Sequence, residues 1–362
     1  MFMAFFLGKL LPWRQAALIC LSVPLTTMLL VLLVPETPIW LLSKGRRKEA
    51  LDSLCKLRGW APPENVQEEF DELVQYTEVM NQCVICIKTS TNDEPKLCDH
   101  ATKNILKRVV LKIRYVLLAK ETLRPFGLVM AYFAFHTLSG VAAIRPNMVN
   151  VCIALGMAYD PKTLVVIVGA ISIVMAVVSA TIVKIIGKRK LILSSMLATS
   201  LSSYAISIYS KQYLNESVFS YEPNTFPKET SIIPVVIFML LICFTSLGIP
   251  WVLLSEMFPF RSRGIATGFT AACVYILFFL SAKTNYDLEY FLHMSGAFAI
   301  YATIGLLGTG YLYLFLPETE NKSLVEIEEF YKGKFKIFAD DVFINLFVRR
   351  KVVEQRQPML VN

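Results

Sequence analysis

The sequence predicts an all-α, polytopic membrane protein. Hydrophobic residues make up 55% of its 362 residues, and the mean hydropathy is +0.53. Seven apolar runs have about the 20 residues that a membrane-crossing helix needs, and Arg145 is the one formal charge inside them. Because the backbone in lipid must satisfy its own hydrogen bonds, runs of this length can only be helices. The runs are Ala16–Val34, Phe126–Ile153 (interrupted), Thr163–Val183, Leu191–Tyr209, Ile232–Leu254, Ile265–Ala282 and Phe291–Leu316.

A repeated tripeptide predicts how these helices are organised. Pro-Glu-Thr occurs at Pro35–Thr37 and again at Pro317–Thr319, each time directly after an apolar run. Six apolar runs separate the copies, which predicts two homologous six-helix halves. The second half is complete, whereas one helix and a short apolar stub precede Pro35. We therefore expect an incomplete chain that lacks most of the first half and carries out no solute uptake by itself.

The net charge of +8 follows membrane topology and does not indicate a nucleic-acid partner. Basic residues gather in the loops after the third and fifth runs and in the C-terminal tail, and such loops are usually cytoplasmic. The segment Ser210–Thr230 is then outside, and Asn215 within it begins an N-glycosylation sequence. The predicted domains are a remnant of the first half (1–41), a cytoplasmic helical linker (42–122), a six-helix transmembrane half (123–316) and a cytoplasmic tail (317–362). Within the linker the apolar spacing predicts helices over Lys44–Arg58, Glu64–Met80 and Lys103–Leu118.

Four short motifs carry a family resemblance. They are Pro35–Leu41, Gly187–Lys190, Pro250–Trp251 with Glu256–Pro259 and Arg263–Gly264, and Pro317–Thr319 with Ser323–Leu324. In this order and at these helices, they resemble the motifs of the sugar-porter family of the major facilitator superfamily. The phrase Ala143–Pro146 also resembles divergent insect members that are trehalose-transporter-like. The resemblance implies the C-terminal six-helix half of that fold, plus one helix and a stub of the N-terminal half.

The motifs also imply a gate at the cytoplasmic rim. Ion pairs there can form when a transporter is open outward and break when it rocks inward. The alternative is that the basic residues merely follow the positive-inside rule. Lys184 departs from the family, which usually carries an acidic residue at that position. The predicted gating residues are Glu36, Lys188, Arg189, Glu256, Arg263 and Glu318.

The positions that match the family's sugar site hold different residues here. Sugar porters bind hydroxyls with amides on the seventh helix, and the matching positions are now His136, Thr137 and Ala142. Amide groups both donate and accept hydrogen bonds, so their loss argues against a standard hexose site while leaving a polar ligand possible. Each candidate could instead be a packing residue, and Arg145 could anchor at the outer interface or face the cavity of a seventh helix broken at Gly140 and Pro146. The predicted substrate-binding residues are His136, Thr137, Ser139, Arg145, Ser172, Trp251 and Tyr275.

The expected function is facilitated transport of a small polar solute by alternating access. We expect the solute to be a sugar such as trehalose or a hexose. The alternative is a transport-inactive membrane sensor or interaction protein derived from a sugar porter. Catalytic constellations and phosphate-binding loops are absent, so the sequence predicts no enzyme and no cofactor. The cluster Cys83, Cys86, Cys98 and His100 has the residue types of a zinc site but no familiar spacing, so no metal is predicted. We expect the plasma membrane as the location, with lipid contacts, and the oligomeric state stays open.

Overall fold

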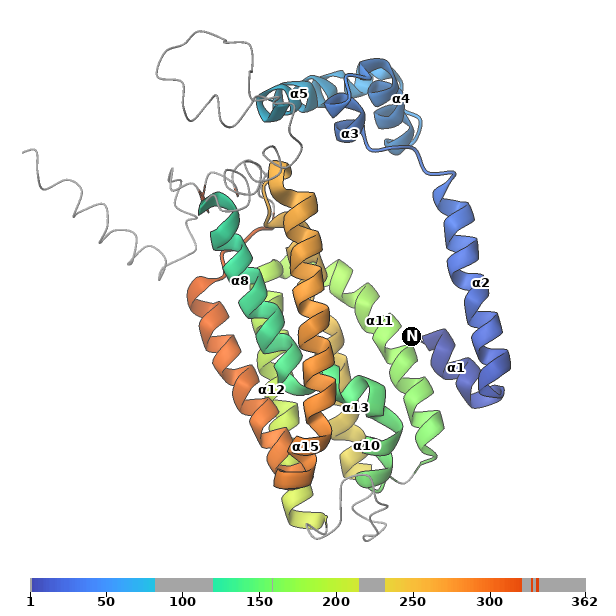
Figure 1. Ribbon diagram of the computed structural model, residues 1–362, viewed down its shortest axis with the longest axis vertical. Helices are drawn as coiled ribbons and strands as arrows, with labels where there is room; N and C mark the ends of the chain where they lie inside the picture. The colour runs from blue at the N-terminus through green and yellow to red at the C-terminus, as the bar shows by residue number, and fades with distance from the viewer. Residues whose placement is uncertain are drawn as a thin grey trace, which may run out of the picture. The chain divides into compact units, whose positions relative to one another are not determined.

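The computed structural model describes residues 2–81, 120–157, 159–214, 232–320, 327, 330 and 331. In these residues the chain forms helices and short turns without a strand, so the predicted all-α class is confirmed. Asn215 and the cluster Cys83, Cys86, Cys98 and His100 lie outside the described residues. The elements, labelled as in Figure 1, are α1 (Phe2–Leu10), α2 (Trp13–Val31), α3 (Pro38–Ser43), α4 (Arg47–Leu57), α5 (Pro63–Asn81), α8 (Lys120–His136), η2 (Thr137–Val141), α9 (Ala142–Ile144), η3 (Arg145–Asn147), α10 (Met148–Ala154), α11 (Pro161–Ile186), α12 (Lys188–Tyr213), α13 (Ile232–Leu247), α14 (Pro250–Glu256) and α15 (Phe260–Phe315).

Six helical segments of the described chain are long and apolar enough to cross a membrane. Five of them correspond one to one to the first five predicted runs. The sixth, Ser262–Phe315, has 54 residues, or about 80 Å of helix at 1.5 Å per residue, so it holds the last two predicted crossings. Figure 1 shows it as two arms, orange and red, and the backbone between them leaves helical geometry at His293 (φ 57°, ψ 178°).

The first arm of α15 is longer than the sequence predicts. The apolar runs predict a loop over 283–290, yet the helix continues to Leu292. The polar residues of this stretch are accommodated because Asn285 and Glu289 are buried and bonded to each other, Asn285 Nδ2 donating to Glu289 Oε1 at 3.1 Å. From the second arm, the hydroxyl of Tyr301 donates to Asn285 Oδ1 at 2.5 Å. Polar side chains therefore join the two arms here.

Two further membrane-length helices are interrupted where the sequence carries glycine and proline. Gly140 has a φ of +95° inside the π-helical turn η2, and the 3₁₀ turn η3 contains Pro146, so the broken seventh helix is confirmed. Gly248 and Ile249 separate α13 from α14, where the ring of Pro250 opens the new helix. Pro lacks an N–H and Gly tolerates positive φ, so both residues favour such interruptions.

The helices fall into two compact units. The first comprises the described residues of Met1–Leu11, Lys120–Pro259 and Arg263–Asn362. A large apolar cluster lies where α10, α11, α12 and α13 meet the second arm of α15, around side chains such as Leu155, Ile206 and Phe238. Large apolar side chains on the outer faces of the same helices are exposed, which is typical of surfaces that face lipid and is rare over such an area in soluble monomers.

The second unit comprises the described residues of Pro12–Ala119 together with Phe260–Ser262. Its helices α3, α4 and α5 enclose a small core that includes Leu42, Leu54 and Phe70. Helices α4 and α5 confirm the first two linker helices predicted from apolar spacing, whereas Lys103–Leu118 lies outside the described residues. The long apolar helix α2 buries only Ala16, so its surface within this unit is open for contact with lipid or other helices.

Candidate functional site

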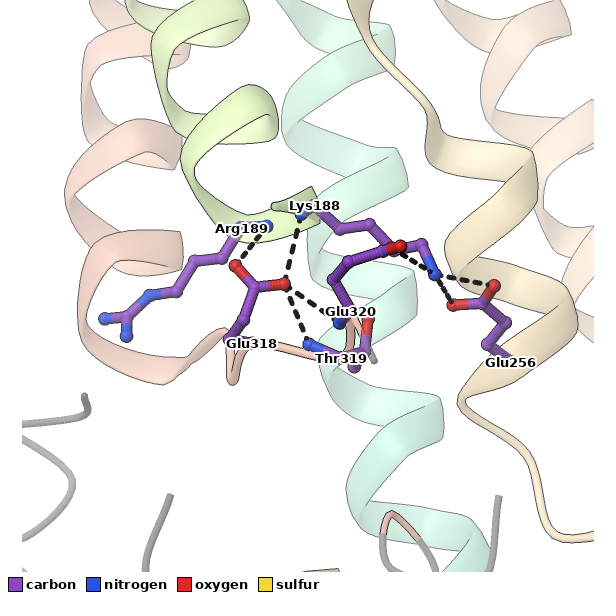
Figure 2. A network of polar contacts seen from close by, with 6 residues as sticks. All are labelled: Lys188, Arg189, Glu256, Glu318, Thr319 and Glu320. Atoms are coloured by element: carbon purple, nitrogen blue, oxygen red, sulfur yellow. Dashed lines mark hydrogen bonds and ion pairs between the residues drawn. The ribbon is translucent and has the colours of Figure 1, made fainter. Parts of the chain in front are cut away.

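The first candidate region is the polar cluster around the turn between α11 and α12 (Figure 2). The carboxylate of Glu318, 130 residues further along the chain than Lys188, lies directly against the start of α12. Its Oε1 accepts the backbone N–H of Lys188 at 3.0 Å and its Oε2 that of Arg189 at 3.1 Å. Oε1 also accepts the backbone N–H groups of Thr319 and Glu320, each at 3.0 Å. The first N–H groups of a helix lack partners inside it and carry partial positive charge, so Glu318 caps α12 from a distant part of the chain.

This arrangement requires glycine at position 187. Gly187 is the N-cap of α12 and has φ +91°, a conformation that other residues adopt only with strain. A Cβ atom there would also lie 2.7 Å from Oε2 of Glu318. Glycine at this position therefore allows the positive φ of the turn and leaves room for the carboxylate of Glu318.

Lys188 extends from the same turn into a pair of carboxylates. Its Nζ lies 2.9 and 2.8 Å from the two oxygens of Glu256 and 2.9 Å from Oε2 of Glu320. Only 12% of the Lys188 side chain is exposed. The cation thus connects α12, the end of α14 and the segment after α15, three places that are far apart in sequence.

The other predicted gating residues have different partners. The Nη2 of Arg189 donates to the carbonyl of Tyr313 at 2.7 Å, and the guanidinium of Arg263 donates to the carbonyl of Phe258 at 3.3 Å. Glu36 belongs to the second unit, where its side chain is exposed and its backbone carbonyl accepts the Ser53 hydroxyl. The contacts described for Lys188, Arg189, Glu256, Arg263 and Glu318 all lie within the first unit. Their gating role stays a prediction.

The second candidate region lies at the two helix interruptions. At Gly140 a Cβ atom would lie 2.6 Å from Cδ2 of the Tyr301 ring, so the interrupted helix and the second arm of α15 approach closely here. One turn earlier, His136 lies beside the other interruption, with its Cε1 3.6 Å from where a Cβ on Gly248 would be. The hydroxyl of Ser139 donates to the carbonyl of His136 at 2.8 Å. The two broken helices therefore meet through His136.

Predicted ligand residues Trp251 and Tyr275 form an aromatic surface next to these interruptions. The Trp251 ring stands edge-on to Phe133 at 5.1 Å and tilted to Tyr275 at 6.1 Å, measured between ring centroids. Phe133 is fully buried, but 44% of Trp251 and 63% of Tyr275 are exposed. Phe133 fixes one edge of the indole and leaves its remaining surface available for a ligand, so both roles considered for Trp251, packing and contact, fit this geometry.

The remaining predicted ligand residues are spread over neighbouring helices. Ser139 and Arg145 line a cavity of about 10 Å³ together with Thr199 and Thr245, which is about enough for one water molecule. Ser172 bonds to the carbonyl of Val168 at 2.9 Å, and its oxygen lies 3.3 Å from the hydroxyl oxygen of Ser246. The Thr137 hydroxyl is buried and has no hydrogen-bond partner among the described residues. The structure thus places His136, Trp251 and Ser139 at or beside the interruptions, and Arg145 of η3 shares a small cavity with Ser139.

Three sets of contacts in these regions are not predicted from the sequence. Glu320, the second partner of Lys188, directly follows the Pro-Glu-Thr repeat. Its place next to that motif is the one sequence feature from which its contact with Lys188 could be predicted. Asn285 and Glu289 stand four residues apart, which places both on one helix face, but in a stretch whose polarity predicts a loop. Tyr301 offers no signal, because its contacts with Gly140 and Asn285 depend on how the helices pack.

Comparison with known proteins agrees with this architecture. A family profile described as "Sugar (and other) transporter" matches residues 2–331. The chain belongs to the sugar transporter family. Among curated members, the facilitated trehalose transporter Tret1 of Apis mellifera ligustica is 26% identical over 337 residues, covering 91% of this chain and 59% of that protein. The same transporter from Polypedilum vanderplanki is 27% identical, with 92% of this chain and 60% of that protein covered.

The fold of this family member is that of the major facilitator superfamily. A solved structure of the proton:xylose symporter XylE bound to 6-bromo-6-deoxy-D-glucose aligns with a TM-score of 0.62 and 20% identity, covering 87% of this chain and 58% of that chain. The chain therefore spans about three fifths of the length of the relatives it matches. Family membership and the membrane-length helices together make it an integral membrane protein.

Proposed function

We propose that this chain forms the C-terminal part of a facilitated carrier that moves a small sugar, such as trehalose or a hexose, by alternating access. The observation that carries the proposal is the meeting of two interrupted helices at His136 and Gly248, in a chain of the sugar transporter family. Interrupted helices near the middle of the bilayer are where transporters of this kind bind their solutes, because free backbone groups face the cavity there. The curated relatives from both insects are facilitated trehalose transporters, which supports this class of solute.

In the proposed site, Trp251 and Tyr275 stack against the apolar face of the sugar ring. Their exposed surfaces adjoin each other, which suits a ring-shaped ligand. His136, Thr137, Ser139 and Ser172 supply hydrogen bonds, since hydroxyl and imidazole groups can both donate and accept. The guanidinium of Arg145, which shares a small cavity with Ser139, adds N–H donors for the hydroxyl oxygens of such a solute.

Uptake measurements test this proposal. A version of the chain that carries the five upstream crossings predicted by the repeat is reconstituted in liposomes, and uptake of radiolabelled trehalose and glucose is measured. Trp251→Ala is expected to lower uptake about five- to thirtyfold, because an aromatic platform for a ligand contributes about 1–2 kcal/mol. Phe315→Ala is the matched control, since Phe315 is also an exposed aromatic residue on a membrane-length helix (55% exposed) and lies at the end of α15, 40 residues after Tyr275.

The outcomes separate the candidate functions. Saturable uptake that falls in the Trp251 variant alone supports a carrier, whereas equal loss in both variants assigns Trp251 to packing. Sugar binding without uptake in the extended chain favours the sensor. Absence of both binding and uptake overturns the proposal.

We also propose the plasma membrane as the location, with the C-terminus and helices α3–α5 in the cytoplasm and Asn215 glycosylated outside. The charge distribution supports this orientation, because the basic turn at Lys188 and Arg189 is then inside. A membrane-impermeant maleimide applied to intact cells should label Gln212→Cys at the end of α12 and leave Lys48→Cys in α4 unlabelled. Labelling of the second variant alone would contradict the orientation.

A further inference from the structure

A pocket with a volume of about 540 Å³ opens between the end of η3, α10 and the first arm of α15. It is lined by Asn147, Asn150, Ala282, Lys283, Tyr286 and Asp287. Figure 1 shows α10 at the end of the bundle where α11 begins, away from the start of α12. The pocket belongs to this end, because Asn150 of α10 lines it. None of the predicted ligand residues at the helix interruptions contributes to its lining. The pocket adjoins the interruption only through Asn147, the last residue of η3.

We infer that this pocket is a second binding site, which captures a neutral, polyhydroxylated solute before the solute reaches the interrupted helices. The inference rests on the proposed function for the identity of the solute as a sugar. Its volume lies within the roughly 300–1,000 Å³ of small-molecule sites.

The chemistry of the lining selects the ligand class. Asn147 and Asn150 bring the amide groups that both donate and accept and that the positions of the family's sugar site lack. Lys283 adds donors and Asp287 adds acceptors, and their opposite charges cancel, which disfavours an ionic ligand. Tyr286, 56% exposed, presents a ring for the apolar face of a sugar.

Both walls are held in place by contacts outside the pocket. The amide nitrogen of Asn147 donates to the carbonyl of Ala143 at 3.2 Å, which orients the side chain. Lys283, Tyr286 and Asp287 share one face of α15, since residues three and four apart are neighbours on a helix. The adjacent face is fixed by the buried bonds from Asn285 to Glu289 and Tyr301. A site with preset walls loses little free energy in ordering its side chains on binding.

Equilibrium binding to the full 362-residue chain in lipid nanodiscs tests the site. Tritiated trehalose and tritiated glucose are the probes, and the variants are Asn150→Ala and Asp287→Asn, both at exposed positions where folding is not at stake. Each variant is expected to weaken binding about three- to tenfold, the effect of losing one or two hydrogen bonds. The matched control is Gln212→Ala, which removes an exposed amide from α12 at the same end of the bundle and should bind as the unaltered chain does.

A second measurement locates the bound sugar. The thiol of Ala282→Cys, placed in the lining, should react with maleimide several-fold more slowly in saturating trehalose, and that of Gln212→Cys at an unchanged rate. Equal binding by all variants, equal reaction rates with and without sugar, or no sugar binding to the chain would each overturn the second site. The proposed carrier would survive those results if the extended chain still shows uptake that depends on Trp251, so the two proposals fail separately.

Discussion

Lys188 pairs with Glu256 and Glu320 in surroundings that leave 12% of its side chain exposed, whereas Arg47 and Glu78 pair with 62% of each side chain exposed. The chemistry of the pairs is alike, but the solvent around them differs. Exposed pairs contribute about 0–1 kcal/mol because water screens them, while removing one member of a buried pair leaves a charge without a partner, which is costly. The polar cluster of the first unit therefore stabilises the packing of its helices. In the second unit the apolar core holds α3, α4 and α5 together, and the exposed ion pairs contribute little to stability.

The largest effect is expected at Gly187, whose positive φ allows Glu318 to approach the start of α12. Gly187→Ala forces a Cβ into a positive-φ position and against Glu318, and we expect a loss of about 3 kcal/mol in unfolding free energy. The matched control is Gly268→Ala on α15, where no atom lies within 4 Å of the added Cβ. Thermal unfolding of both variants in detergent measures the difference. Equal melting temperatures would show that the turn adapts.

The next effect concerns the cap on α12. Glu318→Ala removes the acceptor of four backbone N–H groups, so we expect about 2 kcal/mol of destabilisation. Glu318→Gln keeps one carbonyl oxygen on the side chain and should lose about half as much. If the two variants melt together with the unaltered chain, the carboxylate does not cap the helix.

A smaller effect separates buried from exposed pairs directly. A double-mutant cycle with Lys188→Met and Glu256→Gln should give a coupling energy of about 1 kcal/mol, because contacting charges shielded from water are not independent. The same cycle with Arg47→Met and Glu78→Gln is expected to give a coupling indistinguishable from zero. Chemical unfolding of the four variants of each cycle supplies the values. Similar couplings in both cycles would remove the distinction between the two regions.

The smallest effect is one of pH. Arg58 donates to Glu69 at 2.9 and 2.5 Å, and this hydrogen bond lowers the pKa of Glu69 below its ordinary value of 4.5. A lowered carboxyl pKa contributes stability that is present above the ordinary value and is lost as the pH falls through the folded-state pKa. Arg58→Gln should therefore melt slightly below the unaltered chain at pH 7 and together with it once Glu69 is protonated. A difference in melting temperature between the two chains that grows as the pH falls would contradict the pairing of Arg58 with Glu69.

The sequence by itself determined the helical class and the positions of the crossings, and it indicated the interruption at Gly140 and Pro146. These features are local, since apolar length sets a crossing and glycine or proline sets a break within a few residues. The repeated Pro-Glu-Thr motif also pointed to the cluster at Lys188. The gating and solute-binding roles assigned to these motifs stay predictions.

Only the tertiary structure decided which groups meet. Glu318 caps a helix that begins 130 residues earlier, Glu320 joins Glu256 around Lys188, and Tyr301 reaches both Gly140 and Asn285. The polar stretch 283–290, which the sequence predicts as a loop, is helical, with Asn285 bonded to Glu289 in the same arm and to Tyr301 of the second arm. Such contacts depend on how separate helices pack. Hydrophobic periodicity predicts which face of a helix is buried, but it does not predict which residues of a neighbouring helix contact that face.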